Sequence, residues 1–116
     1  MPSDSSVARR WLNDILYHID HAQSFVAGLD YETFKDDLLR FHAVTPCLKI
    51  ISETPRRLPD EVKARHPSIA CKAMAGAGNL YRRGYDYVAA RRIWETLQIA
   101  LPPLRAVIQQ ELASIP

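Results

Sequence analysis

The sequence predicts an all-α fold: an antiparallel up-and-down bundle with long first, second and last helices. Three observations lead to this prediction. Apolar residues recur at spacings of three and four over long stretches, which is the period of an amphipathic helix. Prolines and glycines fall between those stretches, where helices begin or end. No stretch of useful length alternates polar and apolar residues, so strands are not expected.

The composition indicates one domain spanning residues 1–116. This length is enough for a single core, and a hydrophobic content of 47% excludes disorder. No apolar run approaches the ~18 residues of a membrane span, and the N-terminus lacks the basic and apolar regions of a secretory signal. Cys47 and Cys71 lack metal-ligand spacing and are expected to be buried free thiols. A cytoplasmic protein without a membrane partner is therefore expected.

The first helix is predicted to start near residues 3–6, whose side chains can cap it, and to stop at Gly28. Its apolar positions form one stripe that should face the core: Val7, Trp11, Ile15, Ile19, Ala22 and Val26, widened by Leu12, Leu16 and Phe25.

The second helix is predicted to start at Asp30 and to reach about Thr54. Pro46 lacks a backbone donor, so we expect a kink near residues 42–46. A short helical turn is expected to begin at residues 58–61 and to end at His66. The apolar positions of the second helix are Leu38, Leu39, Phe41, Val44, Leu48, Ile50 and Ile51.

Two further helices complete the expected bundle. One runs from Ile69 to about Arg82 and is rich in alanine and glycine, so packing must hold it. The last runs from about Val88 to Ala113 and should bend near residues 98–99, whose carbonyls lose their donors at Pro102-Pro103. Its inward positions are Ile93, Trp94, Leu97, Leu101, Leu104, Ile108 and Leu112.

The net charge of +2 is too small to indicate a nucleic-acid partner by itself. Arginines occur in adjacent pairs at positions 9–10, 56–57, 82–83 and 91–92. Most of these pairs are expected to be solvated, because adjacent residues on a helix point in different directions. The pairs at 82–83 and 91–92 flank one connection, so they could share a face.

Three segments carry a family resemblance through their order and spacing. Residues 48–59 read LKIISETPRRLP, residues 66–69 read HPSI, and residues 93–104 read IWETLQIALPPL. They resemble "LEIIGEAAKRLP", "YPDI" and "VWETVQNDLPPL" of the HepT-like proteins in the HEPN superfamily, although that family has a tryptophan where Cys71 stands. The resemblance covers roughly Trp11 to Leu112 and implies a HEPN-like bundle.

The same family carries the motif Arg-x4-His-x-Tyr at the end of one helix, and its members are metal-independent ribonuclease toxins that need no cofactor. In this sequence Gly78 and Arg83 stand at the Arg and His positions, and only Tyr85 matches. A guanidinium stays protonated near pH 7 and cannot replace an imidazole as acid or base, while Gly78 has no side chain. The resemblance thus implies a protein of a toxin–antitoxin module whose RNA cleavage is impaired.

In the family, two protomers pair around the motif helices, and a partner nucleotidyltransferase adenylylates the motif tyrosine. The resemblance therefore implies a homodimer, a cognate nucleotidyltransferase and Tyr85 as an AMP acceptor, although Tyr85 could equally be a packing residue. Small residues would let two motif helices approach at the dimer interface: Ala75, Ala77 and Gly78.

Arg82 and Arg83 are candidates for binding RNA or a phosphate. The simpler interpretation is two solvated arginines near a helix C-terminus, where cations interact favourably with the helix dipole. Tyr81 and Tyr87 are expected to be packing residues.

Two alternative functions stay open. The protein could be an active ribonuclease toxin that uses displaced groups, such as His66 or Tyr85 with Arg82 and Arg83. It could also be a non-catalytic subunit that presents a substrate to a nucleotidyltransferase.

The remaining histidines give no strong site. His18 and His21 lie three residues apart and could share a metal, but no third ligand follows at a fitting spacing, so no metal site is expected. His42 and His66 have no obvious nucleophile beside them, and their roles stay open.

Overall fold

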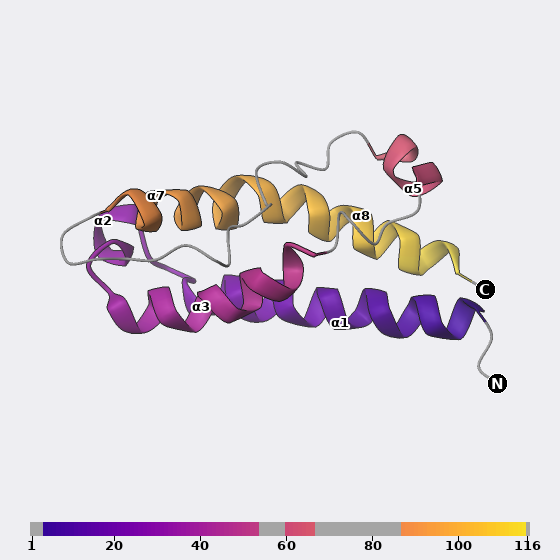
Figure 1. The fold of residues 1–116 in the computed structure, drawn as a ribbon, viewed down its shortest axis with the longest axis horizontal. Helices are drawn as coiled ribbons and strands as arrows, with labels where there is room; N and C mark the ends of the chain where they lie inside the picture. The colour runs from indigo at the N-terminus through magenta and orange to yellow at the C-terminus, as the bar shows by residue number, and fades with distance from the viewer. Residues whose placement is uncertain (1–3, 54–59, 67–86, 116) are drawn as a thin grey trace.

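A computed structural model describes residues 4–53, 60–66 and 87–115 (Figure 1). Helices and their connections make up these described parts, without any strand, which confirms the all-α prediction. None of the described helices combines the length and the apolar character needed to cross a membrane. The helices are α1 (Asp4–Phe25), α2 (Tyr31–Phe34), α3 (Leu38–Ile51), α5 (Asp60–Arg65), α7 (Val88–Glu95), η2 (Thr96–Ala100) and α8 (Leu101–Ser114).

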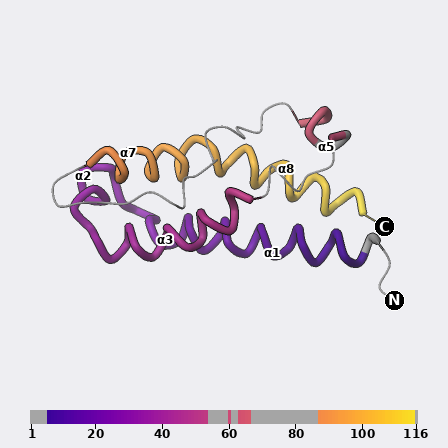
Figure 2. The backbone as a smooth tube through the Cα atoms, in the orientation of Figure 1, coloured from indigo at the N-terminus to yellow at the C-terminus, as the bar shows by residue number. Residues whose placement is uncertain are grey.

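The long helices do not all run in the same direction. Helix α1 is antiparallel both to α3 and to the line formed by α7, η2 and α8 (Figure 1), and it packs on α3 and α8. The tube in Figure 2 shows α7, η2 and α8 following one another end to end. The start of α1 and the end of α8 lie at the same end of the bundle, where Nη2 of Arg9 donates to the carbonyl oxygen of Ile115 over 3.4 Å. The up-and-down arrangement is thus confirmed for these helices.

The core forms between the apolar faces of α1, α3 and the α7–α8 line, much as the spacing of apolar residues predicts. On α1 the exception is Val7, which is 54% exposed because it lies near the free end of the helix. The predicted inward face of the last helix is confirmed, since its members are buried or packed on the core: Ile93, Trp94, Leu97, Leu101, Leu104, Ile108 and Leu112.

The predicted second helix is wrong in one respect, because two helices occupy its place. Asp30 does cap a helix, accepting the backbone N–H of Thr33 over 2.8 Å, but this is the one-turn α2. Asp37 then caps α3 by accepting the N–H of Arg40 over 3.0 Å. An aspartate side chain that satisfies a free N–H favours a new helix start, and it competes here with continuation of α2.

This second start changes which side chains are buried. Leu38 and Leu39 fall in the first turn of α3 and are 54% and 81% exposed, and Ile50 near its end is 43% exposed. These three apolar positions of the predicted second helix therefore lie outside the core. The face that supplies the core consists of Phe41, Val44, Leu48 and Ile51.

The predicted stop of the first helix at Gly28 agrees with the backbone. Helix α1 ends at Phe25, and the chain turns through Gly28, whose φ of +80° lies in the left-handed region. A glycine adopts this conformation without the steric conflict that a Cβ causes.

The two proline sites differ in their effect. Helix α3 continues through Pro46, so the proline does not end it, and the kink expected near residues 42–46 stays a prediction. The neighbouring Thr45 hydroxyl donates to the carbonyl oxygen of Phe41. Before Pro102-Pro103, residues 96–100 form a π-helical turn, which includes the two residues where a bend is expected. The bend itself stays a prediction. The N–H of Leu101 reaches the Thr96 carbonyl, five residues back. A wider turn gives room to the carbonyls of residues 98 and 99, which would otherwise meet the proline rings.

Helix α5 begins within the helical turn expected at residues 58–61 and ends at Arg65, just before His66, as predicted. The helix predicted for residues 69–82 lies outside the described residues, as does Cys71. Cys47 is half-buried rather than buried, and burial raises the pKa of its thiol.

Candidate functional site

The residues singled out from the motif fall in the stretch 67–86, which lies outside the described residues. They are Ala75, Ala77, Gly78, Arg82, Arg83 and Tyr85. Tyr87 is the first described residue after Tyr85, and it precedes α7 as its N-cap. The surface of α7 and η2 is therefore the described surface that follows the motif most directly along the chain.

The helix formed by α7 has two distinct faces. Ala89, Ala90 and Ile93 are buried against the rest of the bundle. Val88 and Arg91 lie on the solvent side, where Val88 is 75% exposed. Of the two arginine pairs that could share a face, the pair at 91–92 lies within the described residues. Its Arg91 is exposed at the surface of α7.

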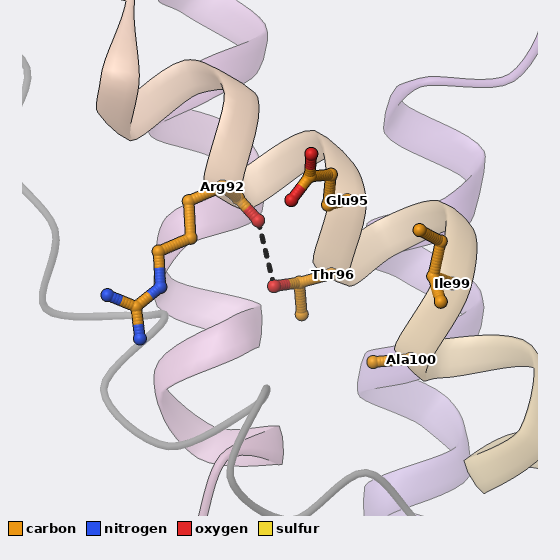
Figure 3. A pocket seen from close by; sticks show the side chains of 5 residues that line it. All are labelled: Arg92, Glu95, Thr96, Ile99 and Ala100. Atoms are coloured by element: carbon orange, nitrogen blue, oxygen red, sulfur yellow. Dashed lines mark hydrogen bonds between the residues drawn. The ribbon is translucent and has the colours of Figure 1, made fainter.

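Two shallow hollows follow each other along this exposed side. One has a volume of about 500 Å³ and lies between α2 and the start of α7, with Tyr31, Tyr87 and Arg91 among its lining residues. The other, of about 300 Å³, lies further along toward η2 (Figure 3). Arg92 and Glu95 line both hollows, so the two form a continuous surface.

Thr96 forms the floor of the second hollow. Its side chain is buried, and its hydroxyl donates to the carbonyl oxygen of Arg92 over 2.9 Å, as the dashed line in Figure 3 marks. Ile99 and Ala100 lie one turn further along in the same view. Because Ile99 is 68% exposed, this hollow has an apolar end and a charged end.

Tyr87 connects the start of α7 to the α2–α3 connection. Its hydroxyl donates to Oδ1 of Asp36 over 2.7 Å. The ammonium of Lys35 lies 5.1 Å from the centroid of the Tyr87 ring and 2.6 Å from a carboxylate oxygen of Glu32. This carboxylate raises the pKa of Lys35. Tyr87 is half-buried, so the expectation of a packing role agrees with the structure, and the hydrogen bond fixes its ring.

Tyr31 lies on the other side of the same hollow. Its ring is 6.4 Å from that of Trp94, and the guanidinium carbon of Arg91 lies 4.2 Å from its centroid. This distance is typical of a cation–π contact. The pairing of Tyr31 with Arg91 has no signal in the sequence, because the two residues come from different helices that are far apart along the chain.

His66 has a partner that the sequence does not reveal. Its Nε2 lies 2.8 Å from Oε1 of Glu111, and Nη2 of Arg65 lies 3.1 Å from both oxygens of that carboxylate. Burial opposes ionisation of Glu111, but the hydrogen bonds from His66 and Arg65 together outweigh it, so the pKa of Glu111 is lowered. This cluster fastens α5 to α8.

The position of His66 matters for catalysis. Helix α5 lies beside the C-terminal part of α8, whereas α2 and the start of α7 lie at the opposite end of the bundle (Figure 1). His66 is bonded to Glu111 near the end of α8, so it belongs to the other end of the bundle from the start of α7, which Tyr87 precedes.

The two histidines of α1 each form a hydrogen bond with the backbone of the same helix. The Nδ1–H of His18 donates to the carbonyl oxygen of Asp14 over 2.8 Å, and that of His21 to the carbonyl oxygen of Tyr17 over 2.9 Å. Across the described ranges, no group of three or more metal-ligating side chains gathers. His42 is exposed, with its ring 5.4 Å from that of Phe41.

Comparison with known proteins identifies the class of protein. The family described as "Ribonuclease HepT-like" matches residues 15–111, which is most of the chain. The protein therefore belongs to the HepT-like ribonuclease family of the HEPN superfamily, and its all-α bundle is HEPN-like.

Curated relatives agree with this assignment. A protein of Caldanaerobacter subterraneus subsp. tengcongensis named "Putative RNase TTE0752" is 30% identical over 104 residues, which cover 90% of this chain and 93% of the relative. "Probable ribonuclease HepT" of Thermococcus cleftensis is 28% identical over 100 residues, covering 86% and 91%. "Putative RNase MJ0125" of Methanocaldococcus jannaschii is 29% identical over 97 residues, covering 84% of each. No solved structure matches the chain.

Proposed function

We propose that this protein is a HepT-like member of a toxin–antitoxin module that is impaired in RNA cleavage and acts by binding a partner nucleotidyltransferase, RNA or both. One observation carries the proposal: Gly78 and Arg83 occupy the positions at which the family motif has Arg and His. Membership of the family supports this reading of the two positions.

The chemistry of RNA cleavage explains why these two replacements matter. A histidine near its pKa can take a proton from the 2′-oxygen or give one to the leaving oxygen, and this help typically contributes about 10²–10⁴-fold. A cation that stabilises the phosphoryl charge contributes a comparable factor. Arg83 cannot exchange protons near pH 7, and Gly78 offers no donor from a side chain. Cleavage should therefore be lower by several orders of magnitude.

Loss of catalysis leaves the means of binding intact. Arg82 and Arg83 add two positive charges, and Arg91 is exposed on the α7 surface that follows them in the sequence. Arginine binds phosphate through a planar set of donors whether or not cleavage follows. Binding of RNA without cleavage is therefore chemically consistent with this sequence.

The retained Tyr85 supports a role in the paired module. We propose that a cognate nucleotidyltransferase transfers AMP to its hydroxyl, and that two copies of the protein, each a single domain, pair through Ala75, Ala77 and Gly78. Incubation with the nucleotidyltransferase and ATP should add the mass of one AMP to the wild type and none to Tyr85→Phe. An unmodified wild type would remove Tyr85 from the proposal, and a monomer in light scattering at micromolar concentration would remove the dimer.

Two alternatives are less well supported. A ribonuclease that uses His66 as its displaced base is disfavoured, because His66 is bound to Glu111 at the far end of the bundle from α7. A subunit that presents a substrate to a nucleotidyltransferase would bind a nucleotide without binding RNA. An assay of RNA binding therefore distinguishes this alternative.

The direct test measures binding and cleavage in the same sample. Wild-type protein is incubated with labelled single-stranded RNA in the presence of EDTA, and one portion is run on a native gel and another on a denaturing gel. We expect shifted RNA that remains intact, and a weaker shift for Arg82→Ala combined with Arg83→Ala. Repeated turnover of RNA by the purified wild type would contradict impaired cleavage, and an unshifted RNA would remove the RNA-binding part.

A further inference from the structure

The hollow between α2 and the start of α7 has the features of a nucleotide-binding subsite. Its volume of about 500 Å³ lies within the range of small-molecule sites. Six side chains line it, and they combine aromatic rings with charges: Tyr31, Tyr87, Val88, Arg91, Arg92 and Glu95. We call it the α2–α7 hollow.

Arg91 is placed to bind an anion. Its guanidinium lies 4.2 Å from the centroid of the Tyr31 ring, and it forms no ion pair with any other residue that the structure describes. An arginine whose face lies over an aromatic ring keeps the N–H groups at its edges directed outward. These edges match the geometry of a phosphate and can bind it with two hydrogen bonds.

The rings of the hollow are held in place before any ligand arrives. The Tyr87 hydroxyl is bound to Asp36 at 2.7 Å, and the Lys35 ammonium lies over the same ring, 5.1 Å from its centroid. The centroid of the Tyr31 ring lies 4.2 Å from the guanidinium carbon of Arg91 and 6.4 Å from the centroid of the Trp94 ring. An aromatic ring with a fixed orientation loses little conformational freedom when a base stacks on it. Stacking on aromatic and guanidinium planes is the usual way in which proteins hold an unpaired base.

The acidic groups near the hollow limit what it can accept. Glu32 is paired with Lys35 and Asp36 accepts the Tyr87 hydroxyl, so neither stands as an isolated charge. Glu95 is the carboxylate that lines the hollow itself. A carboxylate accepts hydrogen bonds from the amino group of a base and repels additional phosphates. This combination fits one phosphate and one base better than a polyphosphate.

We propose that the α2–α7 hollow binds one nucleotide unit, with its phosphate on Arg91 and its base against the rings of Tyr31 and Tyr87. The inference rests on the proposed function, since it names a binding subsite on the surface that follows the motif. The nucleotide is either part of a single-stranded RNA or a free nucleotide. A protein partner is less well matched, because Val88 is the single aliphatic side chain of the lining.

The first experiment measures the affinity of a short fluorescent RNA by anisotropy at low salt, because high salt weakens phosphate contacts. We expect Arg91→Ala to weaken binding about tenfold, as loss of a charge-assisted phosphate contact does. Arg91→Lys keeps the positive charge but loses the planar set of donors. Its affinity for RNA should therefore fall between those of the wild type and of Arg91→Ala. Arg105→Ala is the matched control: it removes an arginine of α8 whose Nε donates to Oδ1 of Asp20 on α1 over 2.7 Å. This substitution should change the affinity less than about twofold.

The second experiment separates the two sources of the nucleotide. AMP is titrated against the complex of protein and labelled RNA, and its own binding to wild type and Arg91→Ala is measured by calorimetry. Displacement of RNA by AMP, with AMP binding lost in Arg91→Ala, identifies a site for free nucleotide. Binding of RNA that depends on Arg91 and resists millimolar AMP identifies a site for a nucleotide within a chain.

The outcomes also separate this inference from the proposed function. If wild type and Arg91→Ala bind RNA and AMP equally well, the hollow is not the subsite, although RNA binding itself stands. If RNA does not bind but AMP binds through Arg91, the hollow is confirmed and the RNA-binding part of the proposed function fails. If wild type binds neither ligand, both are overturned. Far-UV circular dichroism of each variant confirms that its helices are intact.

Discussion

The ring of Phe34 lies 5.3 Å, centroid to centroid, from the ring of Trp94, and this contact holds α2 against α7. Phe34 is completely buried, and its ring also lies 6.4 Å from that of Phe41 on α3. Phe34 is the buried residue of the one-turn helix α2 and is therefore its main anchor. The position of Tyr31, and with it one wall of the α2–α7 hollow, follows from that anchor.

Phe34→Ala should be strongly destabilising. Removal of a fully buried phenylalanine side chain typically costs about 3–5 kcal/mol in the free energy of unfolding, because it leaves a cavity as well as losing buried area. Leu39→Ala is the matched control, since Leu39 is 81% exposed and its truncation should change stability by less than about 0.5 kcal/mol. Urea unfolding followed by circular dichroism measures both. Equal effects of the two substitutions would show that α2 is not anchored in this way.

Gly28→Ala should lower stability by about 1–2 kcal/mol, because its φ of +80° is a conformation that a Cβ disfavours. Space is not the cause, since a Cβ built at Gly28 meets nothing within 4 Å. Gly28→Asn should cost less, because asparagine tolerates the left-handed region better than alanine does. Thermal unfolding of the three proteins tests the order glycine, asparagine, alanine. An alanine variant as stable as the wild type would contradict the backbone explanation.

Glu111→Gln should destabilise the protein at neutral pH and lose that effect in acid. The folded-state pKa of Glu111 lies below its ordinary value of 4.5, so the unfolded state binds the proton more readily. The stabilisation is therefore present above the unfolded pKa and is lost as the pH falls through the folded pKa. Urea unfolding of both proteins from about pH 7 to about pH 3 measures the difference. A difference that stays constant over this range would show that the contacts of Glu111 with Arg65 and His66 are not responsible.

The sequence was sufficient for the elements whose apolar period is regular. The core faces of α1 and of the α7–α8 line are predicted from spacing alone. The two prolines predict that the helix is disturbed near residues 98–99, because a missing N–H has a fixed position, but they do not predict the π-helical turn found there. The separation of α2 from α3 was missed, because Leu38 and Leu39 continue the apolar pattern through the break. The break occurs because Asp37 caps a new helix, which competes with continuation of α2.

The site was less predictable, for a physical reason. The contact of Arg91 with Tyr31 and that of His66 with Glu111 join residues that are far apart in the chain, and no local spacing encodes them. The motif positions could be read only through the resemblance to HepT-like proteins, which the family match confirms. The roles of Gly78, Arg83 and Tyr85 stay predictions.

Restoring the family motif tests the central claim most directly. Gly78→Arg combined with Arg83→His returns the missing cation and the missing acid–base group, so cleavage of single-stranded RNA should rise by at least about 10²-fold over the wild type. Each single substitution should give a smaller gain, and Arg83→Ala should give none. The initial rate of RNA cleavage is measured with EDTA present and with each variant purified identically. Equal rates for the wild type and the double variant, whether both fast or both absent, would contradict the claim that these two positions silence the protein.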